Sequence, residues 1–287
     1  MRPPPRRLAL EANGCFCHWR LSRQHITMRP LNLAGISEFE SVRFVLTDMD
    51  ETLTHRGRLF AATYTALENL QKAGVVVIPV TAAPAGWCDQ MARMWPVDGV
   101  IGENGGFLFQ RDAEGDGIRR AFWHPEDDLE RVAQRLKTIG QEIQAALPNA
   151  QLAEDQGFRT TSLAFAKPED PDLQDEILAR LKAAGADVTV NNLWLLAWFG
   201  GYNKLSAAKR MLKQAYDLDI ETHRDVVLYA GDSTNDAPMF AFFRHTVGVS
   251  TVVEYLPEIP TPPRWITEGP GGVGFVEAAE AILRSQR

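Results

Sequence analysis

Short apolar runs that alternate with helical stretches constrain the fold of this chain most strongly. Strand-like runs are expected at residues 43–47, 75–80, 98–101, 226–230 and 246–249. Hydrophobic spacing predicts helices at residues 61–73, 85–94, 205–216, 237–243 and 273–283. Apolar strands separated by helices are typical of a parallel sheet that is covered on both faces. The sequence therefore predicts an α/β fold with a Rossmann-like parallel sheet core.

Two carboxylates follow the first of these runs. Asp48 and Asp50 come directly after Thr47, and Thr52 stands two positions further on. Side chains at positions i and i+2 of an extended backbone point to the same side. Both carboxylates should therefore emerge beyond the carboxyl end of a strand, where open α/β sheets bind their ligands. One acid can attack or bind a metal while the other moves a proton. Without the other motifs, an acidic turn that caps a helix would explain the two carboxylates equally well.

Three further segments are expected at the same edge of the sheet. Thr81 follows the run 75–80, Lys204 precedes a helical stretch, and the run 226–230 leads into Gly231-Asp232-Ser233-Thr234-Asn235-Asp236. Taken singly, Thr81 could cap a helix, Lys204 could be a solvated lysine, and Asn235 and Asp236 could be turn and cap residues. It is their combination, in this order, that is specific.

The ordered set resembles the haloacid dehalogenase (HAD) superfamily of phosphohydrolases. The matching positions are Asp-x-Asp-x-Thr at 48–52, Thr81, Lys204 and the Gly-Asp-Ser-x-Asn-Asp run at 231–236. The resemblance implies that Asp48 forms an aspartyl-phosphate and that Asp50 acts as general acid and base. Many relatives carry Gly-Arg after the second-motif threonine, whereas this chain has Ala82 and Ala83. Recognition of the leaving group is therefore left open.

The same positions suit Mg²⁺, a hard cation that prefers oxygen ligands and is usually held by one or two carboxylates with phosphate and water. Asp48 and Asp232 are the expected carboxylate ligands, and the resemblance adds the main-chain carbonyl of Asp50. Phosphate binding is assigned to Thr81, Lys204 and Asn235. Asp236 is expected to orient Lys204 and the metal-bound water rather than to bind substrate.

The pattern changes between Gly106 and Gly200. Hairpins are expected at 107–123, around the Gly115-Asp116-Gly117 turn, and at 187–198, through Asn191 and Asn192. Two helical stretches, at 129–147 and 173–184, flank an alternating run at 159–165. This α+β module resembles the cap of the type IIB, Cof-like branch, which includes sucrose-phosphate and mannosyl-3-phosphoglycerate phosphatases. The Glu103-Asn104-Gly105 segment resembles the same branch.

The expected division is a flexible tail at 1–40, a core at 41–106 and 201–287, and a cap at 107–200. Candidate contacts from the cap to substrate are Arg159, Asn191 and Asn192, while Trp194 and Trp198 are expected to pack in its interior. Residues 1–27 carry five arginines against one glutamate, hence +4 of the net charge of −7. This stretch is interpreted as a tail or as an over-long reading frame that truly starts at Met28. Metal binding by Cys15 and Cys17, or an organelle-targeting role, are further alternatives.

Composition agrees with an enzyme of the reduced cytoplasm. The chain has 287 residues, 45% of them hydrophobic, and no apolar run long enough for a membrane span. The net charge of −7 disfavours nucleic acid as a partner. The sequence predicts a Mg²⁺-dependent phosphatase whose substrate is a small phosphate ester, a sugar phosphate or a phosphorylated sugar acid. A sugar phosphomutase and a non-catalytic phospho-ligand sensor are the alternatives, and the oligomeric state is not predicted.

Overall fold

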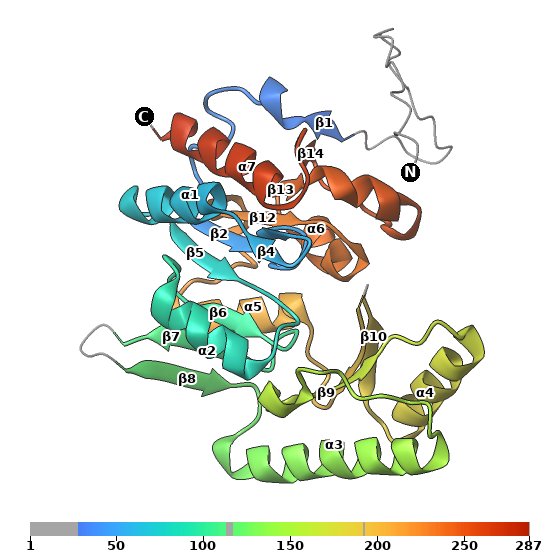
Figure 1. The fold of residues 1–287 in the computed structure, drawn as a ribbon. Coiled ribbons are helices and arrows are strands. Elements are labelled where there is room, and N and C mark those ends of the chain that lie inside the picture. Colours follow the sequence, from blue (N-terminus) through green and yellow to red (C-terminus); the bar gives the residue numbers. More distant parts are fainter. Residues whose placement is uncertain (1–27, 113–116, 192, 287) are drawn as a thin grey trace, which may run out of the picture.

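The computed structural model describes residues 28–112, 117–191 and 193–286 (Figure 1). A core domain built on a parallel sheet lies above a smaller α+β cap in this view, which confirms the predicted fold class. The tail at 1–27, the tip of the first predicted hairpin and Asn192 lie outside the described residues.

The core sheet has six strands in the order β1-β14-β13-β12-β2-β5, and every neighbouring pair is parallel. β2, which precedes Asp48, lies between β12 and β5. The bounds are β1 (Arg29–Pro30), β2 (Phe44–Thr47), β5 (Val76–Pro79), β12 (Val227–Gly231), β13 (His245–Gly248) and β14 (Trp265–Ile266).

Helices cover both faces of this sheet. Successive residues of a strand point to opposite faces, so neighbours in the sequence pack against different helices. Val45 packs toward α1 (Ala61–Lys72), α2 (Ala85–Met94) and α7 (Gly271–Ser285). Leu46, the next residue, packs toward α5 (Lys204–Tyr216) and α6 (Ala237–Phe242).

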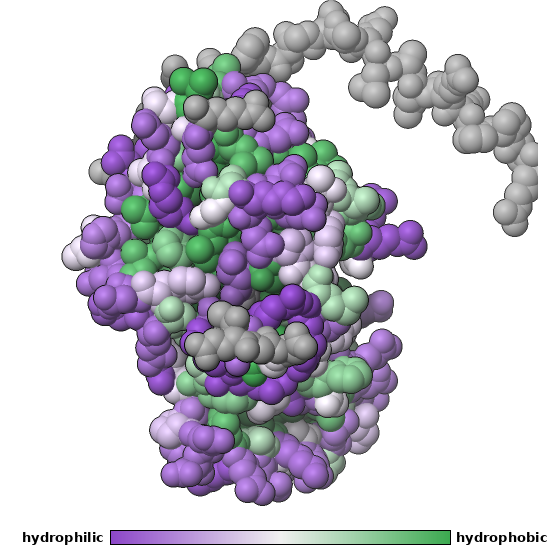
Figure 2. Space-filling model, turned by 90° about the vertical axis from the view of Figure 1, so that its left-hand side faces the viewer, coloured by the Kyte–Doolittle hydropathy of each residue, from purple (hydrophilic) through white to green (hydrophobic). Residues whose placement is uncertain are grey.

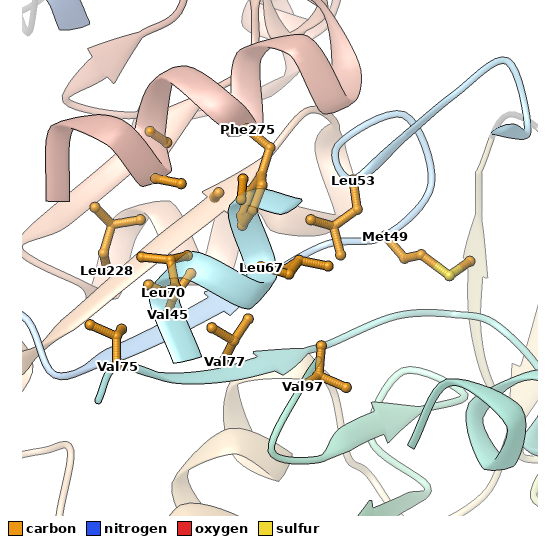
Figure 3. Close-up of a cluster of buried hydrophobic side chains, with 14 of the residues drawn as sticks. Val45, Met49, Leu53, Leu67, Leu70, Val75, Val77, Val97, Leu228 and Phe275 are labelled. Carbon is orange, nitrogen blue, oxygen red and sulfur yellow. The ribbon is translucent and has the colours of Figure 1, made fainter. Parts of the chain in front are cut away.

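Figure 3 shows the first of these interfaces at side-chain level. Leu67 and Leu70 of α1 and Phe275 of α7 meet Val45 of the sheet, and Leu67, Leu70 and Val45 are fully buried. Because helices cover both faces of the sheet, polar side chains can gather at the ends of its strands.

The first predicted hairpin belongs to the core rather than to the cap, so the expected boundary at residue 107 was wrong. β6 (Val100–Gly102), β7 (Phe107–Arg111) and β8 (Ile118–Phe122) form an antiparallel sheet. It is joined to the core sheet by a single parallel bridge between Val80 and Ile101. Phe107 and Phe109 are buried in the same cluster as α2, and this apolar contact holds the hairpin to the core.

The cap proper consists of a three-stranded antiparallel sheet with two helices on its outer face. β9 (Ser162–Ala166), β10 (Asp187–Val190) and β11 (Trp194–Trp198) pair in the order β10-β11-β9. α3 (Glu126–Ala146) and α4 (Pro171–Ala183) bury Leu195 and Ala197 of β11. The alternate residues of β11 face the core, where Trp198 stacks on Tyr202 as an interior residue, as predicted.

Residues 28–40 are part of the core, so the predicted tail is wrong for this stretch. β1 pairs with β14 at the edge of the sheet, and Arg29 stacks its guanidinium on Trp265. Phe39 is fully buried against His245 and Trp265. Two-residue strands have no detectable periodicity, which is why the sequence did not indicate this edge.

The remaining elements are short. They are η1 (Leu31–Leu33), β3 (Thr54–His55), β4 (Arg58–Leu59), η2 (Gln156–Phe158), η3 (Arg224–Val226), η4 (Thr234–Asp236) and η5 (Ser250–Glu258). The face in Figure 2 is mainly hydrophilic, with apolar residues interspersed. Among the described helices, none is long and apolar enough to cross a membrane.

Candidate active site

Strand register brings the predicted motifs together at the carboxyl edge of the core sheet. Thr47, the last residue of β2, is level with Pro79 on one side and Ala230 on the other. Asp48 donates its backbone N–H to the Ala230 carbonyl at 2.9 Å. Thr81 and Asp232, each two residues beyond these partners, therefore flank Asp48.

Lys204 enters the same edge from the first turn of α5. Asn203 begins the helix with a capping box, in which its side chain accepts from the N–H groups of Leu205 and Ser206. The Lys204 ammonium lies 3.0 Å from Asp48 Oδ2 and 2.8 Å from Asp236 Oδ1. Only 3% of Lys204 is exposed, so its charge is held next to these carboxylates rather than in solvent.

Asp236 is fixed by four donors. Its Oδ1 accepts from Lys204 and the Tyr229 hydroxyl, and its Oδ2 accepts from the N–H groups of Asp232 and Ser233. A Cβ at Gly231 would lie 2.5 Å from Asp236 Oδ2, so only glycine lets the carboxylate approach the backbone this closely. With both oxygens occupied, Asp236 is arranged to orient its neighbours.

Asp48, Asp232 and Asp236 form a carboxylate cluster whose oxygens lie within 4.8 Å of one another. The Thr52 hydroxyl donates to Asp232 Oδ1 at 2.9 Å, and the Met49 N–H donates to Asp48 Oδ1 at 2.8 Å. Counting Asp50, four carboxyl groups of the described residues thus lie around the ammonium of Lys204. This surplus of buried oxygen donors fits a hard divalent cation.

The electrostatic consequence of burial is a set of raised carboxyl pKa values. Burial raises the pKa of Asp48 to about 7, against the lowering effect of Lys204. Burial likewise raises the pKa of Asp50 to about 6 and that of Asp232 well above its usual range. Burial alone would lower the pKa of Lys204, but Asp236 and Asp48 outweigh it and raise the value.

Two further predicted residues lie beside this cluster. The Thr81 hydroxyl accepts from the Ala83 N–H at 3.0 Å, which leaves its own proton available for donation. Asn235 Oδ1 accepts from Lys204 at 3.3 Å and from the Ser233 hydroxyl at 3.0 Å. Its amide N–H groups are therefore turned away from the ammonium, which suits an anion-binding role.

Sequence reasoning gave no role to Glu103, the residue that joins core and cap most directly. Its carboxylate accepts from the N–H groups of Ala85, Thr160 and Thr161 and from the hydroxyls of Thr161 and Ser162. Glu103 is 1% exposed and has a φ of 48°. The only signal in the sequence was the turn-like Glu-Asn-Gly segment, which does not reveal partners almost sixty residues away.

The predicted cap residues Arg159 and Asn191 have different hydrogen-bond partners in the structure. Arg159 is held by both oxygens of Asp155, by the Ala82 carbonyl at 3.0 Å and by the Ser162 hydroxyl at 3.2 Å. Asn191 Oδ1 accepts from the backbone N–H groups that follow it in the hairpin turn. Both residues nevertheless line a cavity of about 700 Å³ between core and cap, which also contains Asp50.

Comparisons with known proteins agree with this geometry. No protein-family model matches the sequence. A phosphoglycolate phosphatase from Thermoplasma acidophilum is 27% identical over 211 residues, covering 69% of this chain and 81% of that protein. The sucrose-phosphatase of Synechocystis sp., solved with sucrose and phosphate, is 14% identical with a TM-score of 0.60, covering 83% of this chain and 97% of that one. A Plasmodium vivax protein described as a HAD/COF-like hydrolase is 14% identical with a TM-score of 0.63, covering 87% of this chain and 100% of that one.

The fold is therefore that of the haloacid dehalogenase superfamily, with an inserted α+β cap. In sequence, the chain is similar to a phosphoglycolate phosphatase, and in fold it is similar to solved structures described as HAD hydrolases and phosphatases.

Proposed function

We propose that the protein is a Mg²⁺-dependent phosphatase that hydrolyses a small organic phosphate, a sugar phosphate or phosphorylated sugar acid, through an aspartyl-phosphate at Asp48. The observation that carries the proposal is the carboxylate cluster with Lys204 bonded to two of its members. The names of two similar proteins, a phosphoglycolate phosphatase and a sucrose-phosphatase, support a small phosphate ester as the substrate class.

Asp48, Asp232 and the main-chain carbonyl of Asp50 would hold the cation. When bound, Mg²⁺ supplies positive charge that keeps Asp48 ionised and offsets the charge of the phosphate dianion. Thr52 fixes one oxygen of Asp232 for this purpose. Lys204 and the Thr81 hydroxyl would bind the phosphoryl oxygens, with Asn235 beside them.

In the first step an oxygen of Asp48 attacks phosphorus, and the departing alkoxide takes the proton of Asp50. In the second step a water attacks the phosphorus of the acyl phosphate, passes its proton to Asp50 and releases phosphate with the Asp48 carboxylate restored. Because burial raises the pKa of Asp50 to about 6, this group can exist in both protonation states near neutral pH. That property suits a group that acts first as acid and then as base.

Metal removal tests this proposal. We expect the purified protein to hydrolyse 4-nitrophenyl phosphate with Mg²⁺, to lose this activity in excess chelator and to regain it when Mg²⁺ is restored. Asp232→Asn should raise the Mg²⁺ concentration needed for half-maximal activity by at least about tenfold. Asp219→Asn, outside the site, should not change it. Full activity in excess chelator would contradict the metal requirement, and no turnover under any condition would contradict the phosphatase.

A further inference from the structure

The cavity between core and cap, called here the leaving-group cavity, begins at the proposed acid and base. It is lined by Met49 and Asp50 after β2, by residues of α2, and by cap residues around η2 and the β10–β11 turn. Its volume is about 700 Å³, and Asp50 is the group that would protonate the departing oxygen. The part of a substrate that leaves with this oxygen must therefore occupy the cavity.

Large apolar side chains dominate its wall. Trp87 from α2, Phe158 from η2 and Leu193 from the cap turn are 52%, 59% and 55% exposed, although large apolar groups are normally withdrawn from solvent. Trp95 and Trp194 line the same cavity. Core and cap meet here, because a Cβ at Gly86 would lie 3.0 Å from the Phe158 ring. Aromatic surfaces thus reach the cavity from both domains.

The charges of the cavity are mainly negative. Among the described residues that line it, three are carboxylates, Asp50, Glu154 and Asp155, and one, Arg159, is a cation. The side chain of Arg159 is 1% exposed, and its guanidinium already donates to Asp155, to the Ala82 carbonyl and to the Ser162 hydroxyl. Glu154 is exposed. Arg159 and Asp155 are paired with each other, so an anionic group placed beside Glu154 would meet like charge with no free cation among the described lining residues.

We propose that the enzyme selects phosphate monoesters whose leaving group is uncharged and presents a flat apolar face, and that it discriminates against leaving groups with a second anionic group. The inference rests on the proposed function and narrows its substrate class, because it favours neutral alcohols over phosphorylated acids. Aromatic rings stack on flat apolar faces, while Glu154 repels carboxylates.

Two esters of equal size test the charge part of this proposal. 4-Carbamoylphenyl phosphate and 4-carboxyphenyl phosphate differ by one charge at the far end of the leaving group. With Mg²⁺ present, we expect kcat/KM to be at least about tenfold higher for the carbamoyl ester. Glu154→Gln should reduce this preference at least about threefold. Glu130→Gln, an exposed residue of α3 outside the cavity, should leave it unchanged.

A third ester tests the apolar part. Trp87→Ala should lower kcat/KM for 4-carbamoylphenyl phosphate by about tenfold, while methyl phosphate, too small to reach the tryptophan, should change less than about twofold. Trp87 is half exposed, so its removal leaves the core intact, and Ile36→Ala provides a control at a remote exposed apolar residue. Equal losses on both esters would mean that Trp87 supports closure or folding and would overturn the stacking role.

The outcomes separate this inference from the proposed function. If no ester is hydrolysed above the Asp48→Asn background, the proposed function fails. If both aryl esters are hydrolysed and the carboxylate is equal or better, only the leaving-group inference is overturned. A preference for the neutral ester that Glu154→Gln reduces and Glu130→Gln leaves intact supports it.

Discussion

The carboxyl edge of the core sheet and the leaving-group cavity adjoin at Asp50 but are built in opposite ways. The edge concentrates charge: Asp48, Asp232 and Asp236 surround Lys204, and all four are at most 4% exposed. The cavity is mainly apolar, and its aromatic residues come from α2 and the residue after it, from η2 and from the cap hairpin. We propose that the first region carries out a reaction shared by phosphate monoesters, and that the second distinguishes between their leaving groups.

The difference lies also in how firmly each region is positioned. Asp48 and Asp232 directly follow paired strands, so the sheet register fixes their separation, and the first turn of α5 holds Lys204 beside them. The cavity depends on how the cap sits on the core, a relation that Glu103 secures through its five hydrogen bonds to α2 and to residues 160–162. We therefore expect that changes in the cavity can alter substrate preference without altering the proposed reaction at Asp48.

The largest effect is expected from the edge. Asp48→Asn removes the proposed nucleophile and one metal charge, so activity should fall at least about a thousandfold on methyl phosphate and on aryl esters alike. Steady-state kinetics and a thermal melt would be measured together. Asp127→Asn, on the exposed start of α3, serves as the control. An activity within tenfold of the wild type, or a loss confined to the aryl esters, would break the distinction between the two regions.

A smaller effect, on stability rather than chemistry, is expected at the link between the domains. The Glu103 carboxylate accepts five hydrogen bonds, whereas the amide NH₂ of glutamine can only donate. Glu103→Gln should therefore lower the free energy of unfolding by about 2 kcal/mol. Denaturant titration would measure this loss, with Glu130→Gln as the exposed control. We expect the ratio of activities on methyl and aryl phosphates to shift as well, because the cap loses its anchor. An unchanged stability would show that the contact adds little to cap placement.

The two regions also differ in how much the sequence could predict. The α/β core and the grouping of Asp48, Thr81, Lys204 and Asp232 followed from strands and motifs that are local in the chain. The wall of the leaving-group cavity did not, because Trp87, Phe158 and Leu193 lie in three unrelated segments with no common spacing. The β7–β8 hairpin was misplaced because its alternation is the same whether it packs on the core or on the cap. Arg159 was found in the cavity, but its partners Asp155 and Ala82 became visible only in the structure.

The proposed reaction passes through a phosphoryl group on Asp48, and trapping this group would test it directly. Asp50→Asn removes the base that would activate water, while Asp48 keeps its nucleophilic oxygen. The variant would be incubated with an activated aryl phosphate and Mg²⁺, quenched in acid and analysed by intact and fragment mass, with Asp48→Asn treated in parallel. We expect one added phosphoryl group, located on Asp48 and missing from the Asp48→Asn protein. A phosphoryl group on another residue, or none during continued burst-free turnover, would contradict it.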